Sequence, residues 1–184
     1  MKIAIFTLLL LSSFSIRANE TCAYFAKETI QNKFPEWQSY DNCATYKGRI
    51  LNVLPNHLSK VAFDVSGLAP FWASGHYFYL KEDGNFLSVI PFDNGADTFR
   101  EGLVRSVINS KIAYFNQELQ MVIPPKYDWG WPFYNGRALV CTGCKISEPD
   151  DDGHKPVKGG VWGYINKSGK EVVTVKFNQT EVPD

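Results

Sequence analysis

The stretch Tyr164-Ile-Asn-Lys-Ser-Gly169 decides the fold, because two degenerate copies of it come earlier in the chain. The copies read Tyr79-Leu-Lys-Glu-Asp-Gly84 and Tyr114-Phe-Asn-Gln-Glu-Leu119. The first two copies also continue alike, since Val89-Ile-Pro91 is answered by Val122-Ile-Pro124, and Phe99-Arg-Glu-Gly102 by Phe133-Tyr-Asn-Gly136. Self-similarity at this scale predicts an architecture of stacked units.

Each copy contains the turn of a predicted β-hairpin. Apolar runs with strand composition flank the three turns, at residues 76–80 and 86–90, 111–115 and 119–123, and 161–165 and 170–175. Gly169 suits a left-handed backbone position in the third turn. An isolated hairpin is marginal in water, so each unit should be stabilised by packing on its neighbours.

These units resemble a known family, the WG β-repeat. The run from Val161 to Val173 resembles the core of a unit, and residues 113–140 resemble a complete one, although Leu119 stands where the family has glycine. The resemblance covers residues 75–177 and is poorest in the first unit, residues 77–105. It implies a β-rich repeat fold and no common activity, so what it predicts is architecture.

A different pattern fills the N-terminal part. Ala23, Phe25, Ala26, Ile30 and Phe34 recur every three to four residues, which predicts an amphipathic helix that starts after Thr21 and ends at Pro35. Residues 49–54 and 60–65 are typical of strands. The expected fold class is therefore mainly β, built from antiparallel WG-type hairpins, with a short N-terminal α-helix.

The first 18 residues have the layout of a secretory signal. Lys2 precedes the apolar run of residues 3–11, and the expected cleavage follows Ala18. The alternative, an uncleaved anchor, is disfavoured because the run falls short of the roughly 20 apolar residues of a spanning helix. We expect a periplasmic or secreted protein, not inserted in a membrane once the signal is removed. The expected organisation is signal 1–18, helical segment with a disulfide 19–48, and β domain 49–184.

The charge balance argues against two classes of partner. The chain has 19 basic and 19 acidic residues, and removal of Lys2 and Arg17 with the signal leaves 17 basic residues. A chain with this slight acidic excess has no electrostatic footprint for nucleic acid or for an anionic membrane surface.

Four cysteines, Cys22, Cys43, Cys141 and Cys144, follow the signal. An even number in an exported protein predicts two disulfides. Three pairings are possible, and the economical one joins Cys22 to Cys43 and Cys141 to Cys144, because each bridge then closes within its own region.

The Cys141-Thr-Gly-Cys144 spacing also suits a redox dithiol or half of a zinc site. A zinc site would need two further ligands, for which His154 and residues 150–152 are the nearby candidates. Export favours a structural disulfide over both. The acids at 150–152 are consecutive, which favours an exposed acidic loop over a calcium site, and residues 147–160 as a whole are predicted to be a loop.

The sequence shows no catalytic signature. His57, His76 and His154 are scattered, and no hydrolase, zinc-protease or phosphate-loop motif is present. We expect no catalytic residues, no metal and no cofactor.

Surplus aromatic residues are the best candidates for binding. Trp72 precedes the first unit, and Trp129, Trp131 and Tyr134 lie in a run of five aromatics within eight residues. Exposed, they would form a stacking platform or a protein-binding hot spot, whereas the alternative is packing inside and between repeats.

The sequence therefore predicts an exported, non-catalytic binding protein whose partner is an unknown protein or an envelope glycan. One alternative is a thiol–disulfide redox protein that uses Cys141 and Cys144. Another is an exported inhibitor of a toxin or hydrolase.

Overall fold

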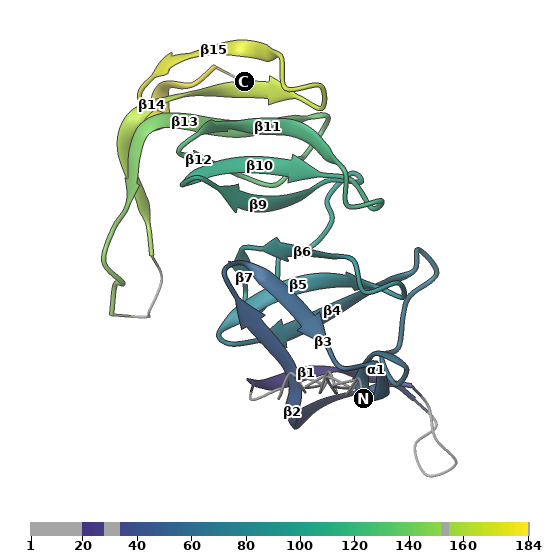
Figure 1. The fold of residues 1–184 in the computed structure, drawn as a ribbon. Helices are drawn as coiled ribbons and strands as arrows, with labels where there is room; N and C mark the ends of the chain where they lie inside the picture. The colour runs from purple at the N-terminus through teal and green to yellow at the C-terminus, as the bar shows by residue number, and fades with distance from the viewer. Residues whose placement is uncertain (1–19, 28–33, 152–154, 184) are drawn as a thin grey trace, which may run out of the picture.

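The computed structural model describes residues 20–27, 34–151 and 155–183, and the strands in these ranges form four antiparallel sheets (Figure 1). The predicted signal, residues 1–18, lies outside the described residues. Two halves follow one another along the molecule, with the strands up to β6 in one and those from β9 onward in the other (Figure 1). No helix among the described residues is long and apolar enough to span a membrane.

The N-terminal half is one six-stranded sheet with the order β3-β2-β1-β4-β5-β6. Its strands are β1 (Glu20–Ala26), β2 (Glu36–Lys47), β3 (Ile50–Val53), β4 (Leu68–Ala73), β5 (His76–Lys81) and β6 (Phe86–Val89). A short helix, α1 (Pro55–Leu58), follows β3. A core cluster, which includes Cys22, Tyr24, Phe71, Phe78 and Leu80, covers one face of this sheet.

The predicted N-terminal helix is wrong where it can be compared, because residues 20–26 form strand β1. This strand pairs with β2 on one side and β4 on the other, so tertiary hydrogen bonds on both edges override the local spacing. Cys22, Ala23 and Tyr24 are consecutively buried, as expected for a strand covered on both faces. Ile30, part of the supposed helical stripe, lies outside the described residues.

The strand predicted at 49–54 is confirmed as β3, whereas that at 60–65 is wrong. In the second segment only Val61 forms a bridge, to Ala26. The backbone N–H of Ala62 donates to the carbonyl of Phe25 at 2.7 Å, so the segment meets the end of β1 only briefly.

All three predicted hairpins are confirmed: β5–β6, β10–β11 and β14–β15. The C-terminal half contains a three-stranded sheet of β9 (Val104–Ile108), β10 (Lys111–Phe115) and β11 (Met121–Tyr127). It also contains a four-stranded sheet of β12 (Trp129–Gly130), β13 (Arg137–Ile146), β14 (Val157–Asn166) and β15 (Glu171–Phe177). The short strands β7 (Pro91–Phe92) and β8 (Gly95–Ala96) link the halves, and a single turn, η1 (Gln179–Glu181), follows β15.

The three hairpin turns have the same backbone geometry. Each closes with an N–H to carbonyl bond of 2.8–3.0 Å, from Gly84 to Lys81, from Leu119 to Asn116 and from Gly169 to Asn166. The donor residue has a positive φ in every turn, including Leu119 at 61°. Leu119 therefore adopts the left-handed conformation for which the other two units use glycine.

A second likeness joins the first two units. Tyr79 packs on Phe99 with ring centroids 4.9 Å apart, and Tyr114 packs on Phe133 at 5.1 Å. The tyrosine hydroxyls donate to backbone carbonyls in corresponding places, Asp97 at 3.0 Å and Trp131 at 2.9 Å. The degenerate first unit thus keeps the side-chain packing of the better-matched second one.

Successive units share their cores. One cluster joins Leu87 and Val89 of β6 to Val104, Ala113 and Phe115 of β9 and β10. The next joins residues of β10 and β11 to the four-stranded sheet, and includes Ile112, Tyr114, Ile123, Val140 and Ile165. The expectation that each hairpin is stabilised by its neighbours agrees with this packing.

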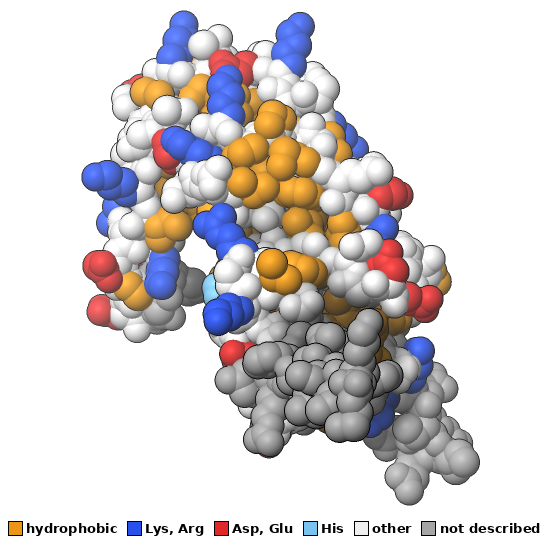
Figure 2. All heavy atoms as spheres, viewed as in Figure 1, with side chains coloured by type: hydrophobic (Ala, Val, Ile, Leu, Met, Phe, Trp, Pro, Cys, Tyr) orange, Lys and Arg blue, Asp and Glu red, His pale blue; other side chains and the backbone are white. Residues whose placement is uncertain are grey.

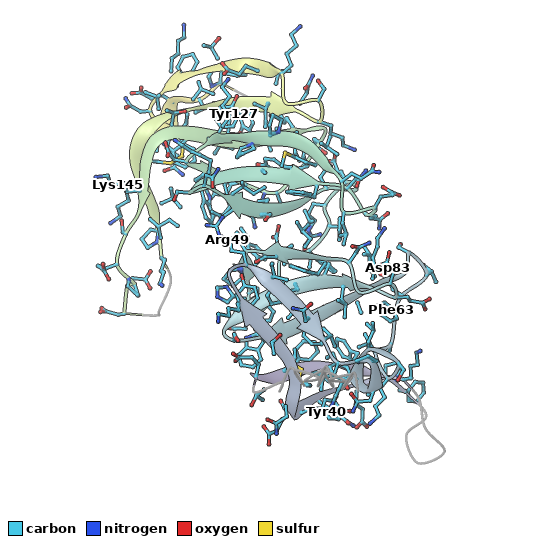
Figure 3. The ribbon with its side chains drawn as sticks, in the orientation of Figure 1. Tyr40, Arg49, Phe63, Asp83, Tyr127 and Lys145 are labelled. Atoms are coloured by element: carbon cyan, nitrogen blue, oxygen red, sulfur yellow. A yellow bond between two sulfur atoms is a disulfide. The ribbon has the colours of Figure 1, made fainter. Side chains whose placement is uncertain are left out.

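Strands β13 and β14 extend further than the sequence predicts. They pair as far as Ile146 and Val157, so the loop expected at 147–160 is shorter. This part of the hairpin projects from its sheet as a curved arm, which carries Lys145 (Figures 1 and 3).

Gly163 lies where the backbone of β15 closely approaches β14. A Cβ on Gly163 would meet the carbonyl oxygens of Val173 at 2.5 Å and Thr174 at 2.7 Å. The glycine therefore admits the backbone of β15. In the pair Trp129-Gly130, by contrast, an aromatic side chain approaches the glycine: a Cβ on Gly130 would overlap the hydroxyl of Tyr114.

Candidate functional site

The strongest candidate site is a pocket of about 390 Å³ on the six-stranded sheet, which we call the aromatic pocket. Its residues come from β1, β2, β4, β5 and the β7–β8 region: Phe25, Trp37, Pro70, Tyr77, Tyr79, Asn94, Gly95, Ala96 and Thr98. Successive side chains of a strand point to opposite faces, and Tyr24, Phe71 and Phe78 belong to the core on the other face. The pocket therefore occupies the face away from that core.

Strand register brings the rings together. Phe25 pairs with Trp37 across β1 and β2, and Pro70 pairs with Tyr79 across β4 and β5. Directly opposed side chains share a face of the sheet. Phe25 and Trp37 meet edge to face with centroids 5.1 Å apart, and remain 38% and 42% exposed. Two large rings are thus held in place while open to solvent.

The chain around β8 forms the opposite wall. The hydroxyl of Tyr77 donates to the carbonyl of Asn94 at 2.9 Å, and that of Tyr79 to the carbonyl of Asp97 at 3.0 Å. Both phenol hydroxyls therefore already donate their proton to the protein backbone and are not free to donate it to a ligand. The side chains of Asn94 and Thr98 make no hydrogen bond within the described part of the chain and are exposed. They are the polar groups available at the rim.

The lining is uncharged. Burial raises the pKa of Tyr79 to about 12, with a smaller contribution from the nearby Asp97 carboxylate. A phenol with this pKa stays neutral throughout the physiological range. The pocket therefore offers ring faces and hydrogen-bonding groups to a neutral ligand.

The structure separates the four aromatic residues that the sequence singles out. Trp72 lies on the same sheet face as the aromatic pocket, opposite Tyr77, but is outside its lining. Trp129 packs between two core clusters, and its Nε1 is buried with no hydrogen-bond partner among the described residues. Trp131 and Tyr134 line a second pocket of about 360 Å³ in the C-terminal half. On the face shown in Figure 2, hydrophobic side chains also gather over strands of that half.

Both disulfides follow the economical pairing, with Cys22 bonded to Cys43 and Cys141 to Cys144. Cys141 is fully buried and Cys144 is 6% exposed. The second bridge lies within β13 and packs against Trp162, whose Nε1 donates to the carbonyl of Gly159 at 2.8 Å. It is thus embedded in the core of the third unit.

The described residues contain no group of three or more His, Cys, Asp or Glu side chains arranged to hold a metal. His57 shares a 3.0 Å hydrogen bond between its Nδ1 and the hydroxyl of Tyr24. His76 packs against Tyr46 with centroids 4.9 Å apart. His154 lies outside the described residues.

Sequence reasoning missed Phe25 and Trp37 as site residues. The three-to-four spacing places Phe25 in a helical stripe, and Trp37 follows Pro35 with no repeat motif to mark it. Only the pairing of β1 with β2 places the two rings side by side. The two-residue spacing of Ala23 and Phe25, which is also typical of one face of a strand, was the available signal for β1. The three-to-four spacing of the apolar residues concealed it.

Comparison with known proteins bears on the repeats. The WG containing repeat family matches the chain at residues 113–143 and 162–182, in the second and third units. No curated protein and no solved structure matches the chain. Together with the equivalent hairpin turns, these two matches identify the chain as a WG repeat-containing protein.

Proposed function

We propose that this chain is an exported, non-catalytic binding protein that holds a neutral sugar unit of a glycan in the aromatic pocket. The observation that carries the proposal is the pair of half-exposed rings, Phe25 and Trp37, at the mouth of an uncharged pocket. Its volume of about 390 Å³ falls in the range of small-ligand sites, which are mostly apolar with a few placed polar groups.

The chemistry of a sugar ring suits this lining. A pyranose has an apolar C–H face and a rim of hydroxyls, and aromatic faces provide apolar contact at low entropic cost. Phe25 and Trp37 would pack on the C–H face, whereas the side chains of Asn94 and Thr98 would meet the hydroxyls. The absence of charge from the lining favours a neutral sugar over a charged one.

Burial of the Cys141–Cys144 bridge weighs against the redox alternative. Thiol–disulfide exchange needs an attacking thiolate to reach a sulfur atom. Here Trp162 and neighbouring apolar side chains cover the bridge. A structural role for both disulfides also fits the export that the signal-like residues 1–18 suggest.

The proposal is tested with the oxidised protein that begins at residue 19. Neutral oligosaccharides of glucose and of N-acetylglucosamine are titrated by calorimetry, with tryptophan fluorescence as a second readout. The Trp37→Ala variant should bind at least about tenfold more weakly, because truncation of an aromatic anchor commonly costs more than about 1.4 kcal/mol. The Phe25→Ala variant should show a smaller loss.

Tyr134→Ala is the matched control, because Tyr134 is an exposed aromatic residue outside this pocket. It should leave neutral-sugar affinity unchanged. Asn94→Ala tests the rim without touching the sheet, and should also weaken binding. Unchanged affinity in both Trp37→Ala and Asn94→Ala would contradict the proposal. The proposal would also be contradicted if this protein bound no sugar and instead bound a hydrolase or toxin on this face. That result would support the inhibitor alternative.

A further inference from the structure

The second pocket, in the C-terminal half, has a different chemistry from the aromatic pocket. We call it the arginine pocket: it has a volume of about 360 Å³, and its lining includes Trp131, Tyr134, Asn135, Arg137, Leu139 and Tyr164. Three of these residues are aromatic and one is cationic, and no acidic residue is among the lining. The combination offers ring faces together with a single positive charge.

Arg137 is held by its neighbours without being neutralised. Its Cζ lies 4.4 Å from the centroid of the Tyr164 ring, a close cation–π contact. Leu139 pairs with Tyr164 across β13 and β14, which places the arginine and the ring on one face. No ion pair or side-chain hydrogen bond joins Arg137 to any other described residue. The guanidinium is thus oriented while its N–H donors remain free.

A tight turn fixes Tyr134 beside Arg137. The N–H of Tyr134 donates to the carbonyl of Arg137 at 2.9 Å, and the reverse bond is 3.2 Å. Asn135 and Gly136 have φ values of 50° and 76°, as in a two-residue hairpin turn. Residues that flank such a turn face the same side of the sheet. Tyr134 is 76% exposed, so its ring is available at the mouth of the pocket.

The carboxylate of Glu101 contacts this turn and is engaged by the turn itself and by Lys167. Both oxygens of Glu101 accept the N–H of Gly136 at 3.1 Å, and Lys167 lies 3.3 Å from one of them. These contacts hold the turn in place from outside the pocket lining. They leave Arg137 as the charged group that faces a ligand.

We propose that the arginine pocket binds an acidic sugar through its carboxylate, a site separate from the aromatic pocket. The planar guanidinium fork matches a carboxylate in a bidentate geometry. One positive charge balances a monoanion better than a phosphate, which carries about −1.5 to −2 at neutral pH. The rings of Trp131 and Tyr134 would take the apolar face of the sugar, and the Asn135 amide a hydroxyl.

The experiment compares matched ligands on the oxidised Trp37→Ala variant that begins at residue 19, so that a neutral sugar held in the aromatic pocket does not contribute to the comparison. Calorimetric and fluorescence titrations use a disaccharide that contains glucuronic acid, its neutral glucose counterpart, acetate and inorganic phosphate. The acidic disaccharide should bind at least about tenfold more tightly than the neutral one, and than acetate or phosphate. Equal binding of the acidic and neutral disaccharides would overturn the charge assignment. Equal binding of acetate or of phosphate would overturn the sugar assignment.

Three variants separate the contributions. Arg137→Gln should reduce affinity for the acidic disaccharide at least about tenfold, and Arg137→Lys should also weaken it because lysine keeps the charge but not the fork. Lys126→Gln removes an exposed charge outside the lining of the arginine pocket and should bind as the unaltered protein does. Full binding by Arg137→Gln, with an unchanged unfolding midpoint, would refute the site.

A cross-test distinguishes this proposal from the proposed function. Trp37→Ala should leave acidic-sugar binding intact, because Trp37 is outside the lining of the arginine pocket. Failure of acidic-sugar binding with neutral-sugar binding retained would refute this inference alone. The opposite result would refute the proposed function alone.

Discussion

Arg105 and Asp97 form a bidentate ion pair that is enclosed by the protein, each side chain being 1% exposed. Nη2 of Arg105 lies 2.7 Å from Oδ1 of Asp97, and Nε lies 3.0 Å from Oδ2. Nη1 donates to the carbonyl of Gly130 at 3.0 Å, so the guanidinium also reaches the next unit. Since Asp97 accepts the Tyr79 hydroxyl through its backbone, this pair anchors the wall of the aromatic pocket.

We predict that Asp97→Asn lowers the free energy of unfolding by about 3–5 kcal/mol, because it leaves the Arg105 charge buried without a counter-charge. The measurement is chemical denaturation of the oxidised protein. Lys126→Gln is the control, since Lys126 pairs with Glu171 at the surface and is 62% exposed. That change should cost less than about 1 kcal/mol. A similar small loss in both variants would show that the enclosed pair does not hold the repeats together.

Gly163→Ala should destabilise the third unit by about 1–3 kcal/mol, the usual cost of overpacking. Its new Cβ would lie 2.5 Å from a backbone oxygen of β15, closer than real Cβ atoms approach. Gly95→Ala is the matched control, because Gly95 lacks a positive φ and its Cβ would have 3.8 Å of clearance. Thermal and urea unfolding should separate the two variants. Equal stability of the two would refute the proposed role of Gly163.

The two disulfides should stabilise the protein unequally. The entropy that a disulfide removes from the unfolded chain grows with the number of residues it encloses. The two bridges span sequence separations of 21 and 3. Cys22→Ala with Cys43→Ala should cost about 3 kcal/mol, and Cys141→Ala with Cys144→Ala about 2 kcal/mol. Urea denaturation of the two double variants provides the comparison. A larger loss from the second pair would show that the bridge acts mainly through packing against Trp162.

Alkaline pH should destabilise the folded state from about pH 10 upward. Burial raises the pKa of Tyr79 to about 12, above its ordinary value of 10.0, so the unfolded chain loses this proton first. The contribution of the neutral Tyr79 phenol to the free energy of unfolding is fully present below pH 10 and is lost as the pH rises toward 12. Unfolding midpoints between pH 8 and pH 12 test this, and Tyr79→Phe should flatten part of the decline. If the unfolding midpoint of that variant fell equally with pH, the loss of stability would come from other groups. Tyr24 and Tyr114 are such groups, because burial also raises their pKa values.

The repeat units could be predicted from the sequence because their signals are local. A hairpin needs two strand-forming runs and a turn, and the turns ending at Gly84, Leu119 and Gly169 mark all three. The disulfide pairing was also accessible, since the partners are close along the chain. The third unit shows the limit of such signals, because no local pattern in the sequence marks the close contact of Gly163 with the carbonyls of β15.

The candidate sites depended on contacts between distant segments. Trp37 reaches the aromatic pocket because β2 pairs with β1, and Thr98 because the chain returns across the sheet after β8. The buried Arg105–Asp97 pair has no sequence mark, since its charged groups look like surface residues until the repeats close over them.

The sequence by itself determined the repeat hairpins and their turns, since hydrogen bonding and side-chain alternation over a few residues are enough to specify them. It favoured, among three possibilities, the cysteine pairing that the structure shows. The tertiary structure alone decided that residues 20–26 are a central strand, because pairing with two neighbouring strands satisfies the backbone groups and also buries Cys22, Ala23 and Tyr24. It also decided which aromatic residues are buried and which are available. Exposure depends on what packs against a ring, and for Phe25, Trp37 and Trp129 those neighbours come from other strands.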